Sequence, residues 1–308
     1  MGCLPRLAAV LALGLAGGCA DTWDRFGEGG TVGASGSGGT SGGAGASGTT
    51  LGGATDGGVV DACGALDLLF VVDNSTANEV ALANIAANIG ILADYLRDAD
   101  EPWSEDVHVG FVRTHPTPGP CNGVGTLSAD PTGSQPCATA SGGAYASAAD
   151  GADFGDVLTC LADIPLVDVA DPPPVAMAAA RGLGRPLPGD PAPDAGCNAG
   201  FLREQAIHAV VIVAAADDPG NGIASPGGPE DWAAALSVLA DPAAGSELVL
   251  YGVVPDPDPP PGCAPRADNL LSWFALHERA SVSDWCRLQT SPTQWVFDAA
   301  TNVASLCP

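Results

Sequence analysis

Two short acidic segments are the parts of this sequence best able to do chemistry. Asp73-Asn74-Ser75 ends one apolar run, and Asp217-Asp218 follows another. Ligands of open parallel sheets bind beyond the carboxyl ends of the strands, which is where both segments are expected to lie. A structural interpretation competes and is preferred. Asp, Ser and Thr at a strand-to-helix turn cap backbone N–H groups, and Asp before Pro219-Gly220 is typical of a turn.

Catalysis by hydrolysis needs a nucleophile, a base and an orienting group, and no motif supplies such a set. The chain after residue 60 has no Gly-x-Ser-x-Gly, His-Glu-x-x-His or Ser-x-x-Lys. The four histidines lack the paired spacing of a zinc site; they are His108, His115, His208 and His277. We therefore expect no enzyme and no cofactor. An envelope hydrolase whose site is assembled in space, around His115 or His208, is the alternative.

The cysteines indicate an oxidising compartment. Of 10 cysteines, Cys3 and Cys19 lie in the first 19 residues. An even set remains, which favours up to four disulfides in an exported domain but leaves the pairing open. These candidates are Cys63, Cys121, Cys137, Cys160, Cys197, Cys263, Cys286 and Cys307.

The first residues have the order of a secretory signal. Arg6 precedes the apolar run Leu7–Leu15, and small residues lead to Cys19. Leu15-Ala16-Gly17-Gly18-Cys19 resembles the lipobox of bacterial lipoproteins. That resemblance implies a signal peptide over 1–18, a lipid on Cys19 and a membrane as partner. The domain would then lie in the periplasm or at the cell surface, anchored to the inner or the outer membrane; an ordinary signal with an incidental Cys19 is the alternative.

Composition separates a tether from a folded region. Residues 27–58 are nearly all Gly, Ser, Ala and Thr, so 19–60 is expected to be a flexible tether. The net charge of −26 opposes binding to nucleic acids, whose phosphates would be repelled.

A further alternative function is that of a structural envelope protein whose surface acids bind Ca²⁺ weakly. The acids in question are Asp98, Asp100, Glu101, Glu105 and Asp106.

Strand and helix patterns alternate over residues 61–308, which predicts one α/β domain with a doubly wound, mostly parallel sheet and helices on both faces. Thr76 and Glu79 have the spacing of a capping box before the first helix. Residues 114–150 are predicted to form a loop-rich stretch. The predicted strands are Leu66–Val72, Val107–Arg113, Ile207–Val213 and Glu247–Val254. The predicted helices begin with an apolar stripe from Ala81 to Leu96 and continue with Phe154–Leu161, Val175–Leu183, Glu230–Ala240, Asn269–Glu278 and Thr293–Ser305.

Asp67–Ser75, followed by a helix, and Gly200–Arg203, leading into Ala209–Val213, resemble the von Willebrand factor A-type domains of bacterial surface lipoproteins. The resemblance implies a Rossmann-like fold and a Mg²⁺ site built from an Asp-x-Ser-x-Ser loop, a Thr and a further Asp. Asp73 and Ser75 match its first two positions.

Two departures from that pattern indicate a vestigial metal site. Ala77 stands at the third loop position and has no oxygen to offer. Ala214-Ala215-Ala216 precedes the pair Asp217 and Asp218, so those carboxylates come two residues late. Thr114 and Thr117 are the nearest candidates for the missing Thr.

The resemblance favours a non-catalytic binding module with an unidentified protein or polysaccharide ligand and without a working metal. It also implies a disulfide between Cys63 and Cys307, because similar domains bring their ends together.

Overall fold

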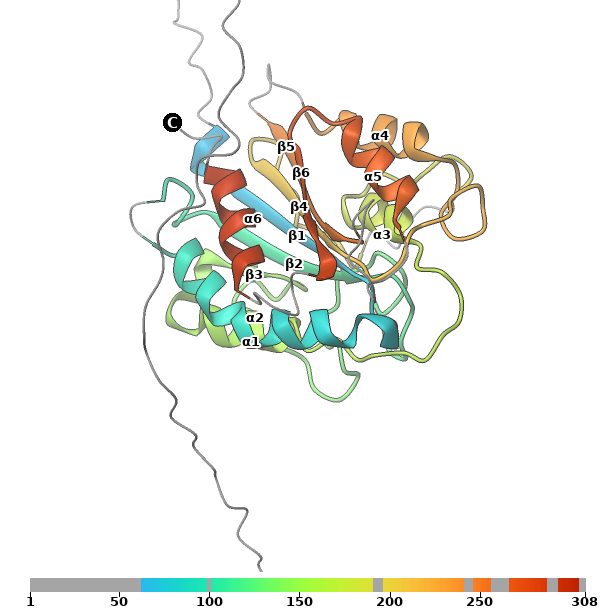
Figure 1. Ribbon diagram of the computed structural model, residues 1–308. Helices are drawn as coiled ribbons and strands as arrows, with labels where there is room; N and C mark the ends of the chain where they lie inside the picture. The colour runs from blue at the N-terminus through green and yellow to red at the C-terminus, as the bar shows by residue number, and fades with distance from the viewer. Residues whose placement is uncertain are drawn as a thin grey trace, which may run out of the picture. The chain divides into compact units, whose positions relative to one another are not determined.

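A six-stranded sheet forms the centre of the domain (Figure 1). The computed structural model describes residues 62–98, 101–190, 196–240, 246–255, 266–286 and 293–304, all within one compact unit, Thr55–Pro308. The strand order is β3-β2-β1-β4-β5-β6. The strands are β1 Leu66–Val72, β2 Val107–Arg113, β3 Ala146–Ser147, β4 Ile207–Val213, β5 Glu247–Val254 and β6 Ala280–Asp284.

Only β3 runs antiparallel to its neighbour among these strands. β1 pairs with β2 on one side and with β4 on the other, both in parallel register. The order 3-2-1-4-5-6 is that of a doubly wound sheet, in which the strand order reverses beside β1. The predicted fold class, a mostly parallel α/β sheet, is confirmed.

Helices cover both faces of the sheet, three on each (Figure 1). Ile85 of α1, Phe154 of α2 and Trp295 of α6 belong to one hydrophobic core. Val175 of α3, Trp232 of α4 and Trp273 of α5 belong to the core on the other face. The helix bounds are α1 Glu79–Leu96, α2 Phe154–Leu161, α3 Val175–Gly182, α4 Pro229–Ser237, α5 Asp268–Ala275 and α6 Gln294–Ala304.

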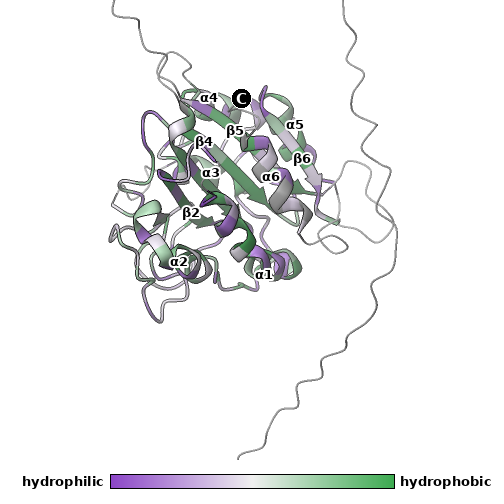
Figure 2. Cartoon of the chain, turned by 90° about the vertical axis from the view of Figure 1, so that its left-hand side faces the viewer, coloured by the Kyte–Doolittle hydropathy of each residue, from purple (hydrophilic) through white to green (hydrophobic). Residues whose placement is uncertain are grey.

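β1 and β4 are buried along their whole length and are hydrophobic apart from Asp67 and His208 (Figure 2). Continuous apolar runs are what strands buried on both faces require. The four predicted strands agree with the structure residue for residue, and the predicted helices agree within a few residues at their ends. Two strands were missed. β3 has only two residues, and β6 reads Ala-Ser-Val-Ser-Asp, too short and polar to stand out.

Helix α1 with its preceding turn, Thr76–Leu96, is long and apolar enough to cross a membrane. Its buried residues, among them Ile85, Ile89 and Leu92, pack in the hydrophobic core against the sheet. α1 is therefore a core helix of the domain.

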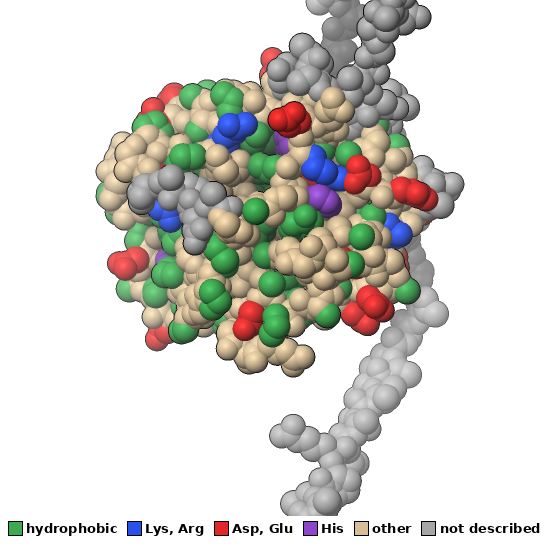
Figure 3. All heavy atoms as spheres, turned by 180° about the vertical axis from the view of Figure 1, so that it is seen from behind, with side chains coloured by type: hydrophobic (Ala, Val, Ile, Leu, Met, Phe, Trp, Pro, Cys, Tyr) green, Lys and Arg blue, Asp and Glu red, His purple; other side chains and the backbone are tan. Residues whose placement is uncertain are grey.

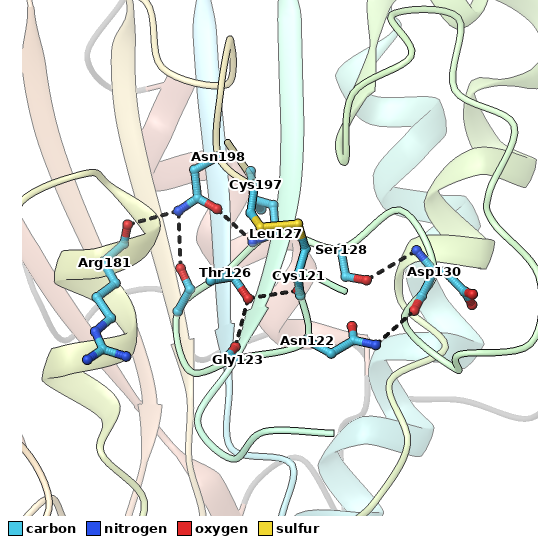
Figure 4. The surroundings of a disulfide bond; sticks show 11 residues. Cys121, Asn122, Gly123, Thr126, Leu127, Ser128, Asp130, Arg181, Cys197 and Asn198 are labelled. Atoms are coloured by element: carbon cyan, nitrogen blue, oxygen red, sulfur yellow. Dashed lines mark hydrogen bonds between the residues drawn. A yellow bond between two sulfur atoms is a disulfide. The ribbon is translucent and has the colours of Figure 1, made fainter. Parts of the chain in front are cut away.

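Two disulfides hold the long connection between β2 and α2. Cys121 bonds to Cys197, and Cys137 bonds to Cys160 at the end of α2. Next to Cys197, the Asn198 side chain donates to the carbonyls of Gly125 and Arg181 and accepts the N–H of Leu127 at 2.8 Å (Figure 4). Disulfide and amide together attach the loop to the segment before β4.

Four predicted disulfide cysteines remain, of which two are bonded and two lie outside the described residues. Cys63 and Cys286 are also disulfide-bonded. Cys263 and Cys307 lie outside the described residues, and so does the predicted pair of Cys63 with Cys307.

One charged residue, Asp67, lies inside β1, and Arg203 neutralises it. The Asp67 carboxylate is buried and accepts the backbone N–H of Arg203 at 2.7 Å and its Nε at 2.8 Å. Arg203 Nη2 also donates to the carbonyl of Leu66 at 2.8 Å. Arg203, one of the residues that carry the family resemblance, thus ties the segment before β4 to the centre of the sheet.

Replacing Arg203 with Met should lower the free energy of unfolding by about 3 to 5 kcal/mol, because Asp67 would stay buried without its counter-charge. Urea denaturation followed by circular dichroism measures this loss. The matched control is Arg266→Met, since Arg266 pairs with Asp268 on the surface and such pairs contribute less than about 1 kcal/mol. Equal losses in the two variants would contradict the role assigned to Arg203.

The domain should contain no free thiols after denaturation without reductant. The six described cysteines of the domain are disulfide-bonded, and Cys263 and Cys307 are predicted to be oxidised as well. Alkylation followed by intact mass measurement counts the thiols, with a reduced sample as control. Two or more alkylated thiols per chain in the unreduced sample would show that the oxidised set is incomplete.

Candidate functional site

The carboxyl end of β1 delivers Asp73 to the edge of the sheet, where it is fully buried. Its Oδ1 accepts the N–H of Ser75 at 3.0 Å, and its Oδ2 accepts the N–H of Ala215 at 3.4 Å. Asn78 fixes the loop that follows β1, because its Nδ2 donates to the carbonyls of Asp73 at 2.7 Å and Val213 at 3.2 Å. Asp73 therefore bridges the ends of β1 and β4 through backbone amides.

The predicted helix capping by Ser75 and Thr76 is wrong, whereas Asp73 does accept backbone N–H groups at this turn. Ser75 precedes a short 3-10 helix, Thr76–Asn78, and no side chain caps that helix or α1, which begins at Glu79. Asp73 instead closes a local turn onto the Ser75 N–H. The Thr76 and Glu79 capping box fails because the 3-10 turn separates Thr76 from the start of α1.

The end of β2 brings Thr114 and His115 beside Asp73. The Thr114 N–H donates to the carbonyl of Val72 at 3.1 Å. Asn74 fixes the backbone of His115, since its Oδ1 accepts the His115 N–H at 2.8 Å and its Nδ2 donates to the His115 carbonyl. The His115 Nε2 atom then lies 3.9 Å from Asp73 Oδ1.

Two buried polar atoms at this edge have no hydrogen-bond partner within the described residues: Thr114 Oγ1 and His115 Nε2. Burial lowers the pKa of His115, and the carboxylates of Asp73 and Asp171 oppose that shift only in part. His115 is thus neutral near pH 7 and does not supply a counter-charge to Asp73. Thr117, the other predicted Thr, is engaged elsewhere, as an acceptor from Arg113.

Asp217 and Asp218 follow β4, and each satisfies the N-terminus of a different helix. Asp217 accepts the N–H groups of Asn269 at 3.1 Å and Leu270 at 3.0 Å, in the first turn of α5. Asp218 Oδ2 accepts the N–H of Ala176 at 2.9 Å, in the first turn of α3. Burial raises the pKa of both carboxyl groups.

Asp218 also shapes its own loop. Its Oδ1 accepts the N–H groups of Gly220 and Ser225, both at 3.1 Å, and its Oδ2 accepts the hydroxyl of Ser225. The predicted turn before Pro219-Gly220 is therefore present. The capping of α3 and α5 from a distance is a role that the sequence interpretation missed. A signal existed, since α3 and α5 follow Pro174 and Ala267, whose side chains cannot cap.

An octahedral Mg²⁺ site takes six oxygens at about 2.1 Å, and the residues at this edge supply few of them. Asp73 offers one carboxylate, and Ser75 and Thr114 offer hydroxyls, whereas Ala77 and Ala215 have no side-chain oxygen. In the described chain, no group of three or more His, Cys, Asp and Glu side chains is placed to hold a metal ion. This donor set does not fit the site that the family resemblance implies.

The other candidate residues lie away from this edge. Asp106 pairs with Arg203 at the amino end of the sheet, and Glu101 hydrogen-bonds to Tyr95. His208 is buried with its Nδ1 3.5 Å from Asp67 Oδ2. Because His208 faces the interior, a substrate has no direct access to it. Asp100 lies outside the described residues.

No family model and no curated protein matches the chain. Solved structures give low similarity. A pilus adhesin, SpaC from Lactobacillus rhamnosus GG, has a TM-score of 0.42 at 12% identity over 78% of this chain and 30% of the adhesin. Proximal thread matrix protein 1 from the mussel byssus has a TM-score of 0.37 at 15% identity over 79% of this chain and 47% of its own.

A manganese-loaded TRAP protein of Plasmodium vivax has a TM-score of 0.35 at 11% identity over 76% of this chain and 74% of its own. The chain spans about a third of the length of the SpaC pilus adhesin. Similarities at these values do not assign a family or a function to the chain.

Replacing Asp217 with Ala should lower the free energy of unfolding by about 1 to 2 kcal/mol, because two N–H groups of α5 lose their acceptor. Thermal melting in the presence of EDTA measures this, so that bound metal cannot contribute. Asp163→Ala, at an exposed loop carboxylate, is the control and should stay within about 0.5 kcal/mol of the wild type. A loss that appears only when Mg²⁺ is added would identify Asp217 as a metal ligand instead.

Proposed function

We propose that the chain is a bacterial envelope lipoprotein that presents a von Willebrand A-like, non-catalytic binding module without a working Mg²⁺ site. In this proposal residues 1–18 are the signal peptide, 19–60 the lipidated tether, and 61–308 the module. The ligand is an unidentified protein or polysaccharide, and the lipid on Cys19 joins the chain to the inner or outer membrane.

The observation that carries the metal-independent part is the use of Asp217 and Asp218. Both carboxylates accept N–H groups of α3 and α5, helices whose own preceding residues provide no cap. Moving either carboxylate toward Asp73 would leave buried N–H groups without acceptors, at a cost of about 1 to 3 kcal/mol each. Metal binding would therefore compete with the packing of these helices.

The cell-envelope part rests on the order Leu15 to Cys19 and on the disulfides. Disulfides persist in oxidising compartments, and the Cys121 to Cys197 and Cys137 to Cys160 bonds are consistent with export. A single acyl chain gives marginal membrane binding, whereas several chains on one cysteine give a stable anchor.

The hydrolase alternative would place its base at His115, which has a carboxylate neighbour in Asp73. The 3.9 Å separation between His115 Nε2 and Asp73 Oδ1 is longer than a hydrogen bond. Asp73 also receives two backbone amides. A catalytic base that is oriented by a carboxylate makes a hydrogen bond of about 2.6 to 3.2 Å to it. The binding function is therefore favoured over the hydrolase.

Wild-type protein should show no shift in thermal melting with Mg²⁺ or Mn²⁺, because Asp73 and Ser75 alone do not hold a cation that dehydrates reluctantly. Ala77→Ser combined with Ala215→Asp, with Ala214→Thr beside them if needed, should create a site. Metal at about 100 times Kd would then stabilise the folded state by about 2.7 kcal/mol.

The two single variants are the controls and should respond little, since ligands act as a set. Ca²⁺, titrated in parallel, separates binding by surface acids. One-to-one Mg²⁺ binding by the wild type that is lost in Asp73→Ala would refute the metal-independent module.

Cys19→Ser should abolish lipid attachment and move the protein from the membrane fraction to the soluble fraction, or leave it uncleaved. The reason is that the thiol is the acceptor of the lipid in the proposed anchor. Metabolic labelling with a radioactive fatty acid, followed by fractionation, measures this, with Cys3→Ser as the matched control. Label that persists in the Cys19→Ser protein would rule out the anchor.

A further inference from the structure

A groove lies at the amino end of β5, at the opposite edge of the sheet from Asp73. A cavity of about 300 Å³ there is bordered by Glu247, Ser237 at the end of α4, and the segment Leu276–Arg279 between α5 and β6. A second cavity of about 270 Å³ shares Ser237, Leu276 and His277 and continues along α4 past Glu230. The two form one groove between α4 and the end of α5.

The groove has an apolar stretch in its middle. Leu276 is 50% exposed although it lies only two residues after the buried α5 residue Phe274. Ala233 and Ala234 of α4 line the same stretch. An exposed leucine beside small side chains leaves room for an apolar side chain of a ligand, whose burial would remove water from both.

The groove also carries an unsatisfied polar atom. His277 Nε2 is buried and has no hydrogen-bond partner among the described residues. The ring packs edge-on to Trp273 with centroids 6.4 Å apart. Burial lowers the pKa of His277, so the imidazole is neutral near pH 7. The ring lines both cavities, and a rotation that brings Nε2 to the cavity surface would offer a ligand one directed hydrogen bond.

Charge in the groove is predominantly negative. Glu230, Glu247 and Glu278 line it, and Arg279 is its one basic residue within the described chain. Arg279 is engaged with Glu247, whose Oε2 lies 3.1 Å from its Nη1. Glu230 and Glu278 make no ion pair with other described residues. Two carboxylates flanking an apolar stretch complement a ligand that joins apolar and basic side chains.

We propose that this groove binds an extended peptide segment of a partner protein in which a basic side chain lies next to apolar ones. The apolar side chain covers Leu276, the basic side chain lies between Glu230 and Glu278, and a peptide N–H or C=O group pairs with His277. The overall charge of −26 draws a cationic partner toward this surface. On the face seen in Figure 3, acidic side chains are scattered and basic ones are few.

The test uses the full chain and two fluorescein-labelled peptides, Gly-Leu-Arg-Leu-Gly and Gly-Leu-Glu-Leu-Gly, titrated by fluorescence anisotropy. Wild-type protein should bind the Arg peptide at least about tenfold more tightly than the Glu peptide, and raising the salt concentration should weaken that binding. Leu276→Asn should weaken it about tenfold through lost apolar burial. Glu230→Gln with Glu278→Gln should weaken it about fivefold and reduce the salt dependence.

Val238→Asn is the matched control, because Val238 is 60% exposed near the same end of α4 but does not line the groove. It should bind the Arg peptide as the wild type does. Thermal melting confirms that each variant is folded, and all four substituted positions are exposed. Equal affinity for the two peptides, no binding of either, or wild-type binding by Leu276→Asn would overturn the proposal. None of these outcomes bears on the anchor at Cys19 or on the metal response of Asp73.

Discussion

The backbone amides at the starts of α3 and α5 constrain the carboxyl edge of the sheet. Each helix begins with N–H groups that have no partner within the helix. Pro174 and Ala267, which precede the two helices, have no side chain that accepts a hydrogen bond. Consecutive aspartates after β4 meet both needs at once, one for each helix. Helix packing on one face of the sheet and the chemistry open to that edge are therefore coupled.

Much of the scaffold could be predicted from the sequence because burial imposes a simple pattern. β1, β2, β4 and β5 are mainly apolar runs, and their ends were predicted correctly because polar or turn-forming residues follow them. β6 escaped because its pairing with β5, rather than its own composition, makes it a strand. Asp67 looked like an interruption of β1. Its partner Arg203 is 136 residues away in the chain, and local pattern does not reveal contacts at that distance.

The position of the candidate-site residues in the fold could be predicted from the sequence, but their hydrogen-bond partners could not. Asp73, Ser75 and Thr114 do gather at the ends of β1 and β2, as strand topology demands. Which donor each oxygen meets depends on loops that fold over one another, so the Asn74 clamp on the His115 backbone had no local signature. The same holds for the groove beside Leu276, which forms between α4 and the end of α5. Two different edges of one sheet thus carry two different kinds of surface, one closed by internal hydrogen bonds and one open and acidic.

Cys63, three residues before the start of the central strand β1, has a mechanical consequence. It is disulfide-bonded, so tension applied to the chain upstream reaches a covalent bond before it reaches β1. Beyond that bond, β1 is held on both sides by parallel partners in unbroken register. A pull along the strand would load these hydrogen bonds in shear, all together, instead of opening them one at a time. The domain is thereby suited to bear force applied through the chain that precedes Cys63.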